Sequence, residues 1–188
     1  MNKAVIIDTD PGIDDAVALG IGLFSDQLDV KLITTVAGNV GIKYVTENML
    51  KLLTFWNLKI PVAQGAAGPL LREVKDASDV HGVTGMAGYE FPTPNRSCLL
   101  EESAVEAMHR TLMASAEKMT IIAIGPLTNI ALLLKTHPEV KERIEELVLM
   151  GGALGRGNFG ILSEFNIAID PEAAKIVFES GLSLAVAP

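Results

Sequence analysis

Four aspartates, Asp8, Asp10, Asp14 and Asp15, lie within eight residues near the start of the chain. Asp8 and Asp10 follow a short apolar run, and a spacing of two places both side chains on one face of a regular strand. Crowded carboxylates are costly to ionise when buried, and a bound cation offsets that cost. Ligation by oxygen alone favours Ca²⁺ or Mg²⁺ over zinc. The stretch therefore predicts a site for a hard divalent cation, calcium or magnesium.

Each aspartate also has an ordinary structural explanation. Asp14 is of a type that caps helices, and Asp15 would complement the dipole of the same helix. Asp10 stands before Pro11-Gly12, a sequence typical of turns. These explanations account for single residues but leave the crowding of four like charges unexplained. We therefore favour the metal site.

Short apolar runs alternate with helical patterns along most of the chain. The expected strands are residues 4–7, 30–37, 60–63, 120–124, 145–150 and 182–187, and the expected helices are residues 14–24, 45–56, 101–116, 126–134 and 171–180. This alternation predicts an α/β fold, with a mostly parallel sheet and helices on both faces.

Two glycine-containing segments, residues 65–96 and 151–166, interrupt the alternation. Each follows an expected strand, so each can reach the carboxyl edge of the sheet. Open α/β sheets bind their ligands at that edge, and long loops in compact domains are usually functional or disordered. We expect both segments to contribute to a ligand site.

Composition excludes several classes of function. The chain has 188 residues, 49% of them apolar, enough for one globular domain. Its net charge is −8 and no Lys/Arg cluster is present, which argues against nucleic-acid binding. The single cysteine, Cys98, excludes an internal disulfide. With no leader-like start and no apolar run of about 20 residues, a cytoplasmic protein that does not enter a membrane is expected.

The sequence DTDPGIDDA at residues 8–16 closely resembles the amino-terminal signature of the inosine-uridine-preferring nucleoside hydrolases. Similar motifs follow in the family's order over essentially the whole chain. Within the family, the sequences of these motifs most resemble those of the broad-specificity ribonucleoside hydrolases of bacteria. These further motifs are residues 34–39, His81-Gly82 with Gly85-Met86, residues 125–131, residues 150–152, Asn158, residues 164–166 and residues 170–174.

The resemblance implies a nucleoside N-ribohydrolase with a Rossmann-like core and one calcium ion per subunit. Such an enzyme hydrolyses the N-glycosidic bond of purine and pyrimidine ribonucleosides to ribose and free base, in nucleoside catabolism and salvage. By resemblance, Asp10 and Asp15 are side-chain ligands of calcium, and the main-chain carbonyl of Ile124 is another. Asp10 is also the implied general base, which takes a proton from a calcium-bound water.

Substrate-binding residues are implied in the same way. The resemblance implies that Asp14, Asn39 and Asn166 bind the 2′- and 3′-hydroxyls of the ribose. The remaining substrate contacts are implied for His81, Met150, Asn158 and Glu164. Asn158 and Glu164 are implied for the 5′-hydroxyl, Met150 for packing near the sugar, and His81 for the active-site loop.

The other histidines and several of these residues have plainer interpretations. Asn39 and Asn158 are types common in turns, Glu164 is a type common on solvated surfaces, and a methionine at a strand end is more often core. His109 and His137 have no partner cluster visible in the sequence, so we interpret both as structural.

Members of the family continue well beyond residue 188, and their carboxyl-terminal third supplies a His-Asp pair. The Asp is a further calcium ligand, and the His is a candidate proton donor to the leaving base. We therefore expect residues 1–188 to be one incomplete domain, the amino-terminal two-thirds of the fold, truncated at its carboxyl end. The family also implies a homodimer or homotetramer.

Two other functions remain open on the sequence. One is a truncated relic of the hydrolase that is inactive or only binds. The other is a phosphatase of the haloacid dehalogenase type, which also places Asp-x-Asp after its first strand but leaves Asn39 and residues 164–166 unexplained. The glycines at 152, 155 and 157 lack the G-x-G-x-x-G order of a nucleotide loop.

Overall fold

A six-stranded sheet, parallel at every pairing, forms the centre of the chain in the computed structural model, which describes residues 2–75, 77 and 82–188. The strands lie in the order β3-β2-β1-β4-β5-β6. Their bounds are β1 (Lys3–Thr9), β2 (Leu28–Thr35), β3 (Val62–Gln64), β4 (Met119–Ala123), β5 (Ile144–Met150) and β6 (Leu184–Ala187). The predicted α/β architecture with a parallel sheet is confirmed.

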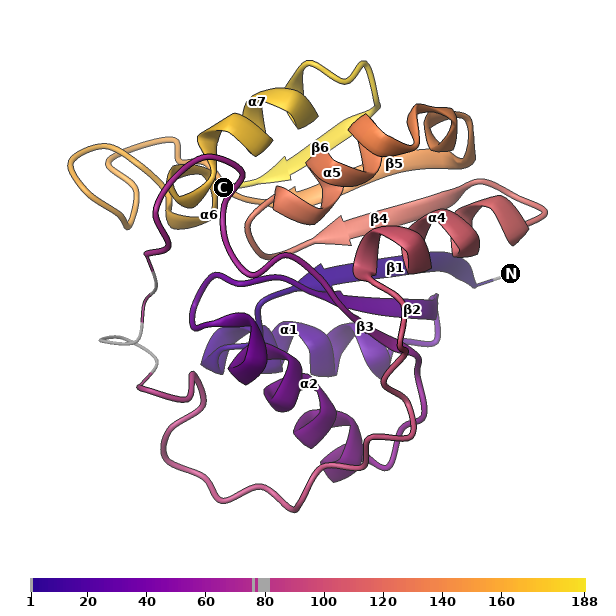
Figure 1. The fold of residues 1–188 in the computed structure, drawn as a ribbon, viewed down its shortest axis with the longest axis vertical. Helices are drawn as coiled ribbons and strands as arrows, with labels where there is room; N and C mark the ends of the chain where they lie inside the picture. The colour runs from indigo at the N-terminus through magenta and orange to yellow at the C-terminus, as the bar shows by residue number, and fades with distance from the viewer. Residues whose placement is uncertain (1, 76, 78–81) are drawn as a thin grey trace.

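Helices cover both faces of this sheet, as Figure 1 shows. One face carries α1 (Ile13–Leu23) and α2 (Ile42–Trp56), and the other carries α4 (Ala104–Ala114), α5 (Thr128–Thr136) and α7 (Pro171–Phe178). Alternation along β1 explains the two layers, because Val5 and Ile7 pack with α1 and α2 while Ile6 packs on the opposite side.

The strand order reverses at β1, which pairs with β2 on one side and β4 on the other. At the carboxyl end of β1, Asp8 lies opposite Thr34 of β2 and Ala123 of β4. The crevice at such a switch point is where open parallel sheets bind ligands. Asp10 follows the end of β1 directly, so the chain topology delivers the aspartates to this crevice.

Two short helices were not predicted: η1, a 3-10 helix (Pro138–Arg143), and α6 (Phe165–Ile169). Both are too short to show a helical hydrophobic period. Local caps define them instead, since Pro138 begins η1 and the Glu164 carboxylate accepts hydrogen bonds from the first backbone N–H groups of α6.

The predicted helix 101–116 is shorter in the structure because α4 begins only at Ala104. The side chain of Ser103 caps that helix by accepting a hydrogen bond from the Glu106 N–H. None of the helices in the described part of the chain is long and apolar enough to cross a membrane.

Candidate active site

The predicted site residues converge at a cavity of about 510 Å³ at the carboxyl edge of the sheet. Nine of the ten predicted residues line it, namely Asp10, Asp14, Asp15, Asn39, Ile124, Met150, Asn158, Glu164 and Asn166. The tenth, His81, lies outside the described residues. A larger cavity of about 860 Å³ shares Phe159 and Glu164 with the first but is not lined by the aspartates. The smaller cavity is therefore the one that the predicted site residues line.

Asn39 holds Asp10 and Asp15 together across the base of this cavity. Its backbone N–H donates to Asp10 Oδ2 at 2.7 Å. Its side-chain Nδ2 donates to the Asp10 carbonyl at 3.0 Å and to Asp15 Oδ2 at 2.9 Å. Asn39 is therefore more than a loop turn residue, because it fixes the two carboxylates relative to each other.

Asp15 also accepts hydrogen bonds from two residues close to it in the sequence. The Thr9 hydroxyl donates to Asp15 Oδ1 at 3.1 Å, and the Gly12 N–H donates to Oδ2 at 3.0 Å. Gly12 is the N-cap of α1, so the interpretation of Asp14 as the cap is wrong. Asp15 does lie in the first turn of α1, where its charge complements the helix dipole. Asp15 nevertheless remains among the residues that line the cavity.

Glycines leave room for the Asp10 carboxylate. A Cβ atom on Gly38 would lie 2.1 Å from Asp10 Oδ2, and one on Gly125 would lie 2.6 Å from Oδ1. Contacts this short do not occur, so backbone alone can approach the carboxylate from these two sides. The glycines after β2 and near the end of β4 thus form the walls around Asp10.

Burial makes the charges at this site costly. Burial raises the pKa of Asp10 well above its ordinary value, and the nearby Asp15 carboxylate raises it further. The neighbouring Asp8 is fully buried, and burial raises its pKa to about 7 despite hydrogen bonds donated by Thr34 and Asn129. Asp8 Oδ2 has no hydrogen-bond partner among the described residues. A cation beside these groups would lower that cost.

The available donors fit a hard cation. Asp10 and Asp15 offer carboxylate oxygens at the cavity, and Ile124 lines the same wall, where its carbonyl oxygen accepts a hydrogen bond from Asn166 Nδ2 at 3.1 Å. All of these donors are oxygens, the kind that calcium and magnesium prefer.

Glu164 and Asn166 form the opposite wall. Glu164 Oε1 accepts from the Asn166 N–H at 2.9 Å, and Oε2 accepts from the Gly152 and Ile167 N–H groups, both at 3.2 Å. Glu164 is buried, so its interpretation as a solvated charge is wrong. Its carboxylate joins the loop after β5 to the start of α6 and gives that loop a defined shape beside the cavity.

Met150 and Asn158 complete this wall. Asn166 Nδ2 lies 3.2 Å from both the carbonyl oxygen and the sulfur of Met150, which is half-buried. Asn158 is exposed, and its Oδ1 accepts from the Phe165 N–H at 2.8 Å. Asp14 is also exposed at the cavity, in contrast to the buried Asp15. Polar groups therefore face the cavity from both walls.

Asn129 supports the site, although its position in the sequence predicts no role for it. Its Nδ2 donates to Asp8 Oδ1 at 2.8 Å and to the Thr35 carbonyl at 3.0 Å, while its Oδ1 accepts from the Ala66 N–H at 2.8 Å. The side chain is fully buried. The available signal was a polar residue directly before the apolar run IALLL.

Replacing Asn129 with alanine should destabilise the chain by about 1–3 kcal/mol. The substitution leaves the Ala66 N–H unpaired and removes one of the two donors to Asp8 Oδ1, while the Thr35 carbonyl keeps its hydrogen bond from the Gly65 N–H. Denaturant unfolding of both proteins measures the difference. Asn2→Ala, at an exposed position before β1, is the control and should change stability by less than about 0.5 kcal/mol.

Comparison with known proteins places this geometry in one family. The family model described as "Inosine-uridine preferring nucleoside hydrolase" matches residues 5–188. The non-specific ribonucleoside hydrolase RihC of Salmonella paratyphi B is 57% identical over 180 residues, which cover 96% of this chain and 58% of the relative. The chain thus spans a little over half the length of this curated relative.

Solved structures agree with the family model. The purine-preferring ribonucleoside hydrolase from Gardnerella vaginalis superposes with a TM-score of 0.92 at 32% identity, over 98% of this chain and 60% of that one. A plant nucleoside hydrolase gives the same TM-score at 38% identity, over 100% of this chain and 60% of that one. The motifs, the sheet order and the aspartate-lined cavity thus have one common explanation: the chain belongs to the inosine-uridine preferring nucleoside hydrolase family.

Proposed function

We propose that this protein hydrolyses the N-glycosidic bond of purine and pyrimidine ribonucleosides, releasing ribose and the free base. The observation that carries the proposal is the cavity at the switch point of the sheet, where Asn39 holds the carboxylates of Asp10 and Asp15 together. The similarity of the chain to a non-specific ribonucleoside hydrolase supports this substrate class.

Calcium is the proposed cofactor, held by Asp10, Asp15 and the carbonyl oxygen of Ile124. These oxygens line one cavity, and the crowding of Asp8, Asp10 and Asp15 supports a cation there. When bound, the ion supplies positive charge that lowers the pKa of an attacking water molecule.

Asp10 is the proposed general base. Its carboxylate is held by the Asn39 N–H at one oxygen and enclosed by the Gly38 and Gly125 backbones, so its orientation is defined. In the ionised form, which a neighbouring cation favours, it can accept the proton of the attacking water. The sugar then passes through a state with oxocarbenium character, which nearby carboxylates stabilise by their negative charge.

Polar side chains around the cavity are proposed to bind the ribose. Asp14, Asn39 and Asn166 are assigned to the 2′- and 3′-hydroxyls, and Asn158 and Glu164 to the 5′-hydroxyl. Met150 would pack against the sugar. The role of His81, a homo-oligomeric state and a cytoplasmic location stay predictions from the sequence.

Ribose release from inosine and uridine, followed with a reducing-sugar assay in calcium-containing buffer, tests the function. The 2′-deoxy analogues are the matched substrates, and we expect them to react at least about 10²-fold more slowly, since a missing hydroxyl leaves polar groups unpaired. Release of phosphate from nucleoside monophosphates, without ribose release, would instead indicate a phosphatase. Absence of both activities, with calcium binding retained, would indicate a binding-only protein.

A further inference from the structure

Outside the active site, two histidines that appeared isolated in the sequence lie together in the structure. His109 of α4 and His137, between α5 and η1, stack with ring centroids 4.0 Å apart and an interplanar angle of 15°. Two carboxylates flank the rings, from Glu106 of α4 and Glu139 of η1. The expectation that neither histidine has partners is wrong, and we call these four residues the histidine cluster.

The distances within the histidine cluster suit a small metal ion. His109 Nε2 lies 3.1 Å from Glu139 Oε1, and His137 Nε2 lies 3.4 Å from Glu106 Oε1. In tetrahedral zinc sites, metal–ligand bonds of about 2.0–2.1 Å place neighbouring ligand atoms about 3.3 Å apart. Ligand atoms of Glu106, His109 and His137 all lie within 4.8 Å of one another. Rotation of the two imidazoles out of their stacked arrangement would direct one nitrogen of each ring at a shared ion.

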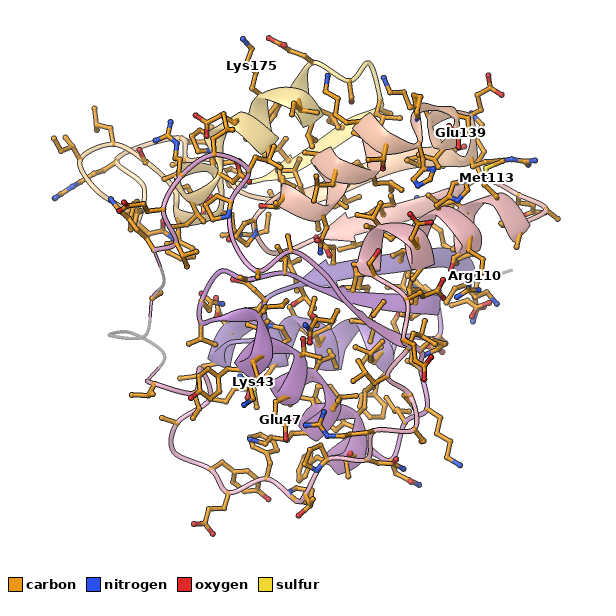
Figure 2. The ribbon with its side chains drawn as sticks, in the orientation of Figure 1. Lys43, Glu47, Arg110, Met113, Glu139 and Lys175 are labelled. Atoms are coloured by element: carbon orange, nitrogen blue, oxygen red, sulfur yellow. The ribbon has the colours of Figure 1, made fainter. Side chains whose placement is uncertain are left out.

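The environment of the cluster also admits an ion from solvent. The imidazole side chains are 29% and 21% exposed, for His109 and His137, while the carboxylates are about half exposed. An ion shared by the four groups neutralises both carboxylates without placing positive charge on the two stacked rings, which would repel each other if both were protonated. Figure 2 shows Glu139 close to the α4 side of the molecule, near the labelled Met113 and away from the carboxyl ends of the strands.

We propose that Glu106, His109, His137 and Glu139 form a second metal site, selective for a divalent transition metal such as zinc. Two imidazoles with carboxylates form a donor set that suits zinc, nickel or copper, in contrast to the all-oxygen set at Asp10 and Asp15. Glu106, His109 and His137 supply three protein ligands, and Glu139, whose Oε1 lies 3.1 Å from His109 Nε2, or a water molecule would complete the four that zinc prefers. Because the ligands come from α4, the end of α5 and η1, the ion would fasten these elements together.

Isothermal titration of the full chain with Zn²⁺, after removal of metals and with calcium present to fill the acidic site, tests this proposal. The wild-type chain should bind one zinc ion. His109→Gln and His137→Gln should each weaken that binding by more than the roughly 10- to 100-fold loss typical of changing an outer-shell partner. Glu142→Gln, which removes an exposed charge from the same short helix η1, is the matched control and should bind zinc like the wild type.

Spectroscopy separates a loss of ligands from a loss of fold. Far-UV circular dichroism should be the same for all four proteins, and Co²⁺ in place of zinc should give the visible absorption of a tetrahedral site in the wild type and in Glu142→Gln only. Zinc binding that is absent from the wild type, or equally tight in both histidine variants, would overturn the proposal. Since neither readout depends on nucleoside hydrolysis, the result is independent of the proposed function.

Discussion

Replacing Asp10 with asparagine should lower kcat for ribonucleoside hydrolysis by about 10²- to 10⁴-fold, the range that general-base catalysis usually contributes. Asparagine has nearly the same shape, so an Oδ atom can still accept the hydrogen bond from the Asn39 N–H. It cannot accept a proton from water, and it offers the cation a neutral oxygen. The measurement is ribose release from inosine at saturating calcium, with circular dichroism to show that the variant is folded.

Asp26→Asn is the matched control for that experiment. Asp26 is an exposed carboxylate between α1 and β2, and its removal changes the net charge by the same amount. Activity of this variant should equal that of the wild type. An Asp10→Asn protein that keeps more than about a tenth of the wild-type kcat would show that another group takes the proton.

Replacing Asp8 with asparagine should stabilise the calcium-free chain at pH 8 by up to about 4 kcal/mol. The pKa of Asp8 is about 7 in the folded chain against an ordinary value of 3.8, because the side chain is buried. Asparagine keeps the acceptor oxygen for Thr34 and Asn129 and replaces the unpartnered Oδ2 with a neutral amide. The cost of ionising a buried carboxyl group is thereby removed.

The stabilising effect of Asp8→Asn should increase as the pH rises. Below about pH 4 the Asp8 carboxyl group is protonated in both the folded and the unfolded chain, and its contribution to stability is fully present. Between about pH 4 and 7 only the unfolded chain loses that proton, so the free energy of unfolding falls as the pH rises. Urea unfolding in EDTA at pH 5 and pH 8 should show a smaller loss for Asp8→Asn than for the wild type. Equal losses in both proteins would contradict the raised pKa.

Most of the fold follows from hydrophobic periodicity. The buried runs that became β1, β2, β4 and β5 are apolar enough to be covered on both faces, and the intervening segments have helical spacing. Helix ends were less predictable, because α4 begins where Ser103 caps it and α6 exists through the Glu164 cap. Those ends depend on single hydrogen bonds, which a period cannot reveal.

That the candidate site residues lie together was predictable from the aspartate spacing and from the motifs of the family, since all those that the structure describes line one cavity. Their supporting contacts were not. Asn129 reaches Asp8 from a helix far along the chain, and the pairing depends on how α5 packs on the sheet. His109 and His137 likewise meet only because α4 lies beside the end of α5. Such contacts are properties of tertiary packing rather than of local sequence.

Calcium binding by the full chain, measured by isothermal titration after removal of metals, tests most directly whether the aspartates form the metal site of a ribonucleoside hydrolase. We expect one calcium ion per chain, with Asp15→Asn weakening the binding at least about tenfold and Asp26→Asn leaving it unchanged. The ion should also raise the thermal midpoint of the wild-type chain, since a ligand that binds the folded state stabilises it. Calcium that fails to bind, or that binds wild type and Asp15→Asn equally, would contradict this account.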